Sequence, residues 1–224
     1  MAGIYVHVPF CKVKCHYCDF HFSTNLSGKS KLVDALITEI QQKSILFKNE
    51  IVNTIYFGGG TPSLLNSTEL NAILSKIRDG YNVSPTAEIT LEANPDDLDK
   101  EKLEVLKTAG VNRLSIGVQS FDQKNLEYMN RAHNADEAHN SIILAQEIGF
   151  NNITIDLIYG LPNTTLADWK KELDKFIAMD VPHLSAYCLT IEPQTYFGHL
   201  SKNNLLHIPE DEVSLSQFKY LMDF

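Results

Sequence analysis

Short β-rich runs recur along this chain, and the gaps between them are long enough for one helix each. Six such runs lie at residues 4–8, 54–57, 87–93, 113–120, 152–160 and 183–190. Neighbouring strands that are joined by a crossover helix pair in parallel, whereas antiparallel strands need only a tight turn. The sequence therefore predicts an α/β fold with a six-stranded parallel sheet. We expect a (βα)6 layout that curves into a partial TIM barrel, since a closed barrel of this kind has eight strands.

Helical periodicity is clearest between the second and third of these runs. Asn66 and Glu69 form a capping-box signature, and the apolar positions that follow have the spacing i, i+3, i+4, i+7: Leu70, Ile73, Leu74 and Ile77. Comparable patterns predict helices over 30–47, 99–109, 135–148 and 165–179. Gly110 and Gly149 follow two of these helices as C-terminal stops. The last helix carries its apolar stripe at Trp169, Leu173, Phe176 and Ile177.

Composition limits the classes of function. The chain has 224 residues, 44% of them hydrophobic and 21% charged, which suits one globular domain with its own core. A net charge of -9 provides no basic surface for nucleic acid, so we exclude nucleic acid as the main partner. No run approaches the roughly 18 apolar residues of a membrane span, and the N-terminus shows no leader pattern. These features predict a cytoplasmic protein without a membrane span.

The end of the chain predicts one more helix, which begins behind Pro209. Its apolar residues run to the final position: Phe218, Tyr220, Leu221 and Phe224. An apolar face of this kind needs a partner to cover it. We therefore expect residues 1–200 to form a core domain and residues 201–224 to begin a C-terminal extension that is truncated here.

Three of the four cysteines fall within eight residues, as Cys11, Cys15 and Cys18 with the spacing C-x3-C-x2-C. The cytoplasm is reducing, so a disulfide framework is unfavourable and the cluster predicts metal ligation. A zinc site would need a fourth ligand, for which the nearby candidates are His7, His16 and His21. A 4Fe-4S cluster held by three cysteines would leave one iron open to an external ligand, and we favour this interpretation.

Other polar residues gather where the predicted strands end, and in parallel sheets ligands bind at that edge. They are the glycine turn 58–62, Glu92, Asn94, Gln119 and Asp156. Three consecutive glycines match neither a dinucleotide fingerprint nor a P-loop, and they suit either close approach of a ligand or a plain tight turn. The fourth cysteine, Cys188, lies in an apolar run and is predicted to be an inert core residue.

Several motifs together resemble the radical S-adenosylmethionine (SAM) superfamily, and within it the oxygen-independent coproporphyrinogen oxidase-like branch. The resemblance extends from Tyr5 to about Glu192. The motifs that carry it are YVHVPFC, CHYCDF, FGGGTPSLL, LEANPDD, RLSIGVQSFD, NRAH and DLIYGLPNTT.

The resemblance implies that Cys11, Cys15 and Cys18 hold a 4Fe-4S cluster whose open iron binds SAM. Reductive cleavage of SAM in this family yields a 5'-deoxyadenosyl radical, and the electron comes from a donor such as a flavodoxin or ferredoxin. The family's SAM contacts correspond to Tyr5, Gly59, Gly60, Thr61, Glu92, Gln119, Arg131 and Asp156. A guanidinium suits a carboxylate, and acidic or amide side chains suit hydroxyl and ammonium groups.

One position separates two branches of this family. Members that oxidise coproporphyrinogen extend the loop to C-x3-C-x2-C-x-C, but here Phe20 occupies the place of the fourth cysteine. The chain is therefore most similar to the HemW branch, whose members bind heme and transfer it to acceptor proteins. The alternative is an oxidoreductase that decarboxylates coproporphyrinogen III in porphyrin biosynthesis. Whether the chain is an enzyme stays open on these residues.

Overall fold

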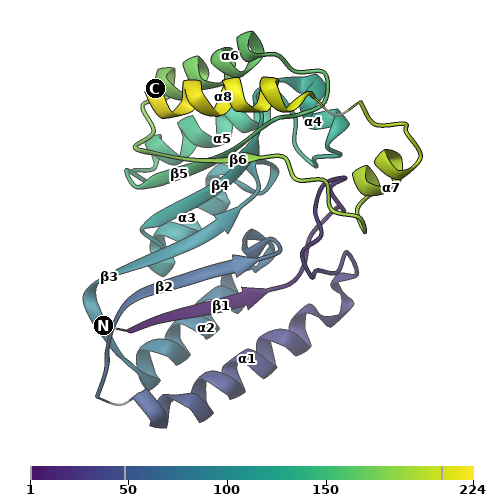
Figure 1. Cartoon of the computed structure of the whole chain (residues 1–224). Helices are drawn as coiled ribbons and strands as arrows, with labels where there is room; N and C mark the ends of the chain where they lie inside the picture. The colour runs from purple at the N-terminus through teal and green to yellow at the C-terminus, as the bar shows by residue number, and fades with distance from the viewer. Residues whose placement is uncertain (1, 48, 208) are drawn as a thin grey trace.

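The computed structural model describes residues 2–47, 49–207 and 209–224, and it contains one six-stranded sheet (Figure 1). The strands are β1 (Ala2–Val8), β2 (Ile51–Gly59), β3 (Asn82–Ala93), β4 (Arg113–Gln119), β5 (Ile153–Tyr159) and β6 (His183–Cys188). They lie in the order β1-β2-β3-β4-β5-β6, and every neighbouring pair is parallel. The predicted α/β class and the (βα)6 order are confirmed.

Helices occupy the crossovers between the strands. The main crossover helices are α1 (Lys29–Ser44), α2 (Ser67–Gly80), α3 (Lys100–Ala109), α5 (Ala135–Glu147) and α6 (Leu166–Ala178). Each matches a predicted helix, with α1 three residues shorter at its end because residues 45–47 form a 3₁₀ turn. Gly110 and Gly149 have positive φ values of 99° and 93°, which confirms them as helix stops. The described residues form three further α-helices, α4 (Gln123–Tyr128), α7 (Tyr196–Lys202) and α8 (Asp211–Asp223), of which only α8 was predicted.

The core lies between the sheet and these helices. The apolar stripe of α2 is at most 1% exposed, and the capping box of Asn66 and Glu69 is present. Burying such side chains stabilises the fold by about 1.5–3 kcal/mol each, so α2 is held by its packing more than by its local propensity. On α6, Trp169 and Leu173 are buried, but Ile177 is 60% exposed. The prediction for Ile177 was wrong because it lies at the edge of the stripe.

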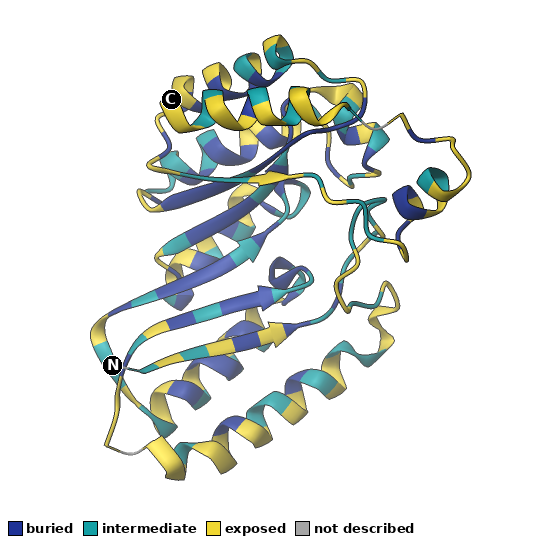
Figure 2. Ribbon diagram, viewed as in Figure 1, coloured by how far each residue is buried: buried dark blue, intermediate teal, exposed yellow. Residues whose placement is uncertain are grey.

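The sheet does not close on itself. The β1 and β6 strands are the two ends of the strand order: β1 alternates exposed residues with half-buried or buried ones, and β6 has no buried residue (Figure 2). The β4 and β5 strands, by contrast, have no exposed residue. The fold is therefore a partial barrel that is open between β1 and β6. Figure 1 shows the segment after β1 lying at the carboxyl ends of the strands, next to α7.

The last helix, α8, packs beside α6 (Figure 1), and its Tyr220 and Leu221 contact the main core. On the same helix Phe218 and Phe224 are 44% and 48% exposed. The predicted division at residue 200 falls inside α7 and stays a prediction. Among the described residues, no helix is both long enough and apolar enough to cross a bilayer.

Candidate functional site

The cysteine segment follows β1 and is fixed by backbone hydrogen bonds at several points. The Cys11 amide donates to the carbonyl of Ser23, 3.1 Å away, and the Ser23 amide donates to the carbonyl of Pro9 at 2.9 Å. In the middle of the loop, the His16 amide donates to Met129 after α4, at 3.0 Å. The loop is therefore held in one shape by the chain itself, which prepares its side chains for a ligand.

The glycine turn after β2 lies against the start of this loop. The Gly60 amide donates to the Val8 carbonyl at 2.9 Å, and the Thr61 amide donates to the Phe10 carbonyl at 2.7 Å. A Cβ atom on Gly60 would stand only 2.7 Å from the Phe10 carbonyl oxygen. The interpretation of a plain tight turn is therefore insufficient, because Gly60 lets two backbone segments meet directly in front of Cys11.

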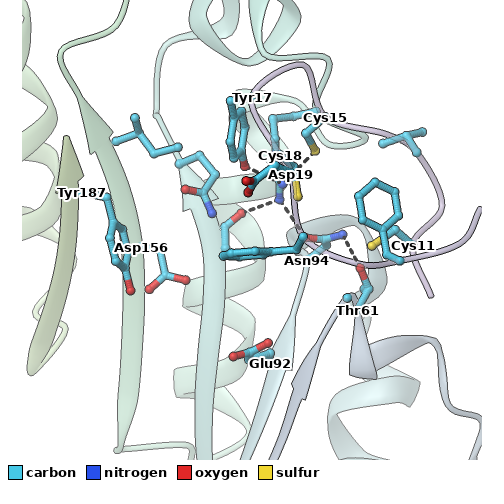
Figure 3. Close-up of a pocket in the computed structure, with 18 of the residues that line it drawn as sticks. Cys11, Cys15, Tyr17, Cys18, Asp19, Thr61, Glu92, Asn94, Asp156 and Tyr187 are labelled. Carbon is cyan, nitrogen blue, oxygen red and sulfur yellow. Dashed lines mark hydrogen bonds between the residues drawn. The ribbon is translucent and has the colours of Figure 1, made fainter. Parts of the chain in front are cut away.

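One cavity of about 470 Å³ joins this loop to the carboxyl ends of the strands (Figure 3). All three clustered cysteines and all but one of the eight predicted SAM contacts line it: Cys11, Cys15, Cys18, Gly59, Gly60, Thr61, Glu92, Gln119, Arg131 and Asp156. In the view of Figure 3, the labelled cysteines lie on one side of the cavity and Asp156 and Tyr187 on the other. Strand ends that are distant in sequence thus form one pocket.

Tyr5 is the predicted contact that does not line the cavity. Its ring is 58% exposed and stacks on Tyr56, with 5.9 Å between the ring centroids. The Tyr56 hydroxyl in turn donates to Glu92 Oε1 at 2.7 Å. Tyr5 therefore packs against Tyr56, which positions Glu92. A contact between Tyr5 and SAM stays a prediction.

Glu92 is held by two donors. Besides Tyr56, the Gly59 amide donates to its other carboxylate oxygen at 3.1 Å. Burial raises the pKa of the Glu92 carboxyl, and these two hydrogen bonds oppose the rise. The carboxylate is thus fixed in direction while both of its oxygens keep lone pairs for a ligand.

Gln119 enters the cavity through an irregularity at the end of β4. The pairing of β4 with β5 shifts between Ile116 and Gln119, and Gln119 has a φ of 68°. A positive φ is costly for a residue with a Cβ and is often found at functional sites. This distortion changes the direction of the chain at the end of β4, where Gln119 lines the cavity.

Asp156 lies on β5 opposite Ser185 of β6. Burial, together with the charge of nearby Glu92, raises the pKa of Asp156 to about 7 from its ordinary value of 3.8. The carboxyl therefore binds a proton more tightly in the folded chain than in the unfolded chain. It follows that folding stability falls as the pH rises from about 4 to about 7.

Replacing Asp156 with Asn should remove this pH dependence. Asp156→Asn should match the parent at pH 4 and be more stable at pH 8, by at most about 4 kcal/mol, since each pH unit between the two pKa values is worth about 1.4 kcal/mol. Urea denaturation at pH 4, 6 and 8 measures this difference. Asp174→Asn on the exposed side of α6 is the control and should track the parent. Parallel pH profiles for Asp156→Asn and the parent would contradict the assignment.

The described residues do not provide the set of ligands that a zinc site needs. Within the described ranges, no three His, Cys, Asp or Glu side chains are grouped to hold one metal ion. Of the candidate histidines, His16 uses Nδ1 to contact the Tyr128 carbonyl at 2.8 Å, and its ring centroid lies 4.2 Å from that of Tyr196. A 4Fe-4S cluster does not need its ligands to converge on one ion, because each cysteine binds a different iron. The three cysteines line one cavity, which suits such a cluster.

The prediction about Cys188 was wrong. Cys188 is exposed and lines the cavity at the end of β6, so it is not an inert core residue. Its position at a strand end was the signal that could have placed it there. His133, two residues after Arg131, is 3% exposed and contacts the Val118 carbonyl at 3.0 Å. Burial lowers the pKa of His133 to about 4, so this histidine is a neutral structural residue.

Sequence reasoning missed Tyr17 as a lining residue, whereas Asn94 was expected at this edge of the sheet. Tyr17 and Asn94 both accept hydrogen bonds from Arg131, at 3.2 Å and 2.7 Å. The structure places the Arg131 guanidinium beside Cys15, with 3.3 Å between Nη1 and the cysteine Sγ. Tyr17 lies between two cysteines in the motif CHYCDF, and that position was its signal in the sequence.

This arrangement of a cysteine loop, a glycine turn and strand-end polar residues on a parallel partial barrel defines a cofactor-binding α/β protein. The sequence model of the Radical SAM superfamily matches residues 5–176. The chain belongs to that superfamily, whose members generally use a 4Fe-4S cluster and SAM. The residues present fit both groups, because the three cysteines line one cavity with a glycine cradle and with Arg131, whose buried Nε atom has no partner in the part of the chain that the structure describes.

Within the superfamily, the chain is similar to proteins named heme chaperone HemW. It is 37% identical to that of Lactococcus lactis over 98% of this chain and 57% of the relative. It is 38% identical to that of Bacillus subtilis over 99% of this chain and 59% of the relative. The chain thus spans little more than half the length of these curated relatives.

The structure is also similar to that of coproporphyrinogen III oxidase (HemN) from Escherichia coli, a radical SAM enzyme. The TM-score is 0.88 at 29% identity, and the match covers 99% of this chain and 51% of the other. Both branches expected from the sequence are therefore represented among its relatives.

Proposed function

We propose that this chain binds a 4Fe-4S cluster through Cys11, Cys15 and Cys18, and SAM in the remainder of the same cavity. The observation that supports the proposal is the single cavity that joins the cysteine loop to the strand-end residues. When bound, the cluster would supply the electron for cleavage of the SAM sulfonium. The chain's own residues orient the ligand: Gly59, Gly60 and Thr61 permit close backbone approach, and Glu92, Gln119 and Asp156 accept hydrogen bonds from polar groups.

We further propose that the protein acts in heme transfer, as a HemW-like chaperone in the cytoplasm with heme as cargo and a heme-acceptor protein as partner. Two features support this function. The similar relatives carry that name, and Phe20 stands where a fourth cysteine is expected in the oxidase branch. Phe20 is 73% exposed and lines the cavity together with Phe22. An exposed ring and a half-buried ring beside a cavity suit the flat apolar face of a porphyrin.

The alternative function is oxidation of coproporphyrinogen III, which the structural similarity to the Escherichia coli oxidase supports. That reaction removes carboxyl groups as CO2, whereas heme transfer leaves the porphyrin unchanged. The electron donor in either case would be a small redox protein such as a flavodoxin or ferredoxin.

One experiment separates the two functions. Anaerobically reconstituted protein should change the absorption spectrum of added heme and release no labelled CO2 from coproporphyrinogen III that is labelled in its propionate carboxyls. The Escherichia coli oxidase serves as the positive control for CO2 release. Turnover of the labelled substrate would contradict the chaperone function and establish the alternative.

A variant tests the role of Phe20. Phe20→Ala should weaken heme binding about tenfold or more, because burial of an aromatic ring contributes about 1.5–3 kcal/mol. Phe218→Ala removes an exposed ring from α8, away from the cavity lining, and should leave heme affinity unchanged. Equal losses in both variants would show that Phe20 has no specific role.

A further inference from the structure

Arg131 has already used both of its terminal nitrogens within the chain. Its Nη1 donates to Cys15 Sγ at 3.3 Å and to the Tyr17 hydroxyl at 3.2 Å. Its Nη2 donates to Asn94 Oδ1 at 2.7 Å and to the Gly117 carbonyl at 2.8 Å. A guanidinium has five N–H donors, so these four contacts leave only the hydrogen on Nε. That Nε atom is buried and has no partner among the described residues.

This use of donors limits what Arg131 can offer to SAM. A bidentate clamp on a carboxylate needs two parallel N–H groups, and here a second one would be available only if a contact with the chain broke. The bidentate role suggested by residue type therefore disagrees with the geometry. What Arg131 does offer is a hydrogen bond and a fixed positive charge at the sulfur of a cysteine in the proposed cluster triad.

Asn94 holds this guanidinium in place. Its side-chain oxygen accepts from Arg131, while its side-chain nitrogen donates to Thr61 Oγ1 at 3.4 Å. The two contacts determine the orientation of the amide, because the opposite orientation would turn the NH2 group toward the guanidinium. Asn94 thus connects the glycine turn to the cation beside Cys15, as Figure 3 shows for Asn94 and Thr61.

Hydrogen bonds to cluster sulfurs and the local net charge set the reduction potentials of iron–sulfur clusters. Reduction adds one negative charge, and a nearby donor that carries a positive charge favours the reduced form. We propose that Arg131 raises the reduction potential of the cluster by donating to Cys15 Sγ, and that Asn94 is the positioning residue for this contact. This inference rests on the proposed cluster site and adds to it two residues with an assigned redox role.

The test is an EPR-monitored redox titration of reconstituted protein without SAM, with dithionite as reductant. Arg131→Gln should lower the ratio of reduced to oxidised cluster at least tenfold at a fixed ambient potential, which is about 59 mV per tenfold for one electron. Asn94→Ala should shift the ratio in the same direction by less. Lys14→Gln removes an exposed cation from the same loop without touching a sulfur, and it should change the ratio less than threefold.

Each outcome decides the proposal. An unchanged potential in Arg131→Gln, together with weaker SAM binding by calorimetry, would make Arg131 a ligand clamp and overturn the inference. An equal shift in Lys14→Gln would show that charge alone, without the hydrogen bond, is responsible, and would also overturn it. If Arg131→Gln retains too little iron to titrate, Asn94→Ala decides, and an unshifted potential there refutes the inference. A parent protein that binds no cluster would instead refute the proposed function.

Discussion

Replacing Cys15 with Ala should leave the protein without its iron. The parent protein, reconstituted anaerobically, should contain about four Fe and four sulfide per chain, and Cys15→Ala should contain almost none. Three thiolates are already one fewer than a 4Fe-4S cluster usually has, so the loss of one more leaves too few ligands. Iron and sulfide analysis, with an EPR spectrum after dithionite reduction, measures the result.

The fourth cysteine provides a matched control. Cys188 lines the same cavity but lies at the end of β6, outside the loop of the triad. Cys188→Ala should therefore keep the full iron content. Stoichiometric zinc in the parent, with no EPR signal after reduction, would contradict the cluster. Loss of iron in Cys188→Ala would show that the ligand set differs from the triad.

A methyl group at Gly60 should disturb both folding and cluster binding. A Cβ there would lie 2.7 Å from the Phe10 carbonyl oxygen and 2.8 Å from its amide nitrogen. These are backbone atoms, which cannot rotate away as a flexible side chain can, and Phe10 directly precedes Cys11. Overpacking of this kind costs about 1–3 kcal/mol, and the required movement would displace the first cysteine. Gly60→Ala should therefore be less stable in urea and should lose most of its iron.

Gly28→Ala is the control for this prediction. A Cβ on Gly28 would meet only the tip of the Phe10 ring, at 3.9 Å, which is an ordinary contact. This variant should keep both the stability and the iron content of the parent. If Gly60→Ala bound iron normally, the glycine turn would not be needed to position the cysteine loop.

The fold could be predicted in most of its parts because its signals are local. The capping box at Asn66, the stripe on α2 and the stops at Gly110 and Gly149 depend on residues within a few turns of each other. Because a helix lies between each two successive strands, with short connections on either side, the strands then pair in parallel. The short helices α4 and α7 were missed, because six or seven residues offer too little periodicity to detect.

The sequence could predict that the ends of the strands form the site, but it could not predict how the side chains are arranged within the site. Tyr5 lies outside the cavity, and Cys188 lies inside it. Both results depend on how the edge strands β1 and β6 curve, which no residue pattern records. In the same way, the apolar run around Cys188 resembles a buried strand, although β6 is an edge strand with one side open.

The sequence by itself determined the order of the strands and helices, the triad of thiolates and the polar residues that end the strands. These follow from hydrophobic periodicity, caps and spacing, which act over a few residues. Only the tertiary structure decided that Arg131 donates to Cys15 across 116 residues of chain, and that Asn94 holds it there. Such contacts depend on the curvature of the sheet and on side-chain directions, so they exist only once the strands are assembled.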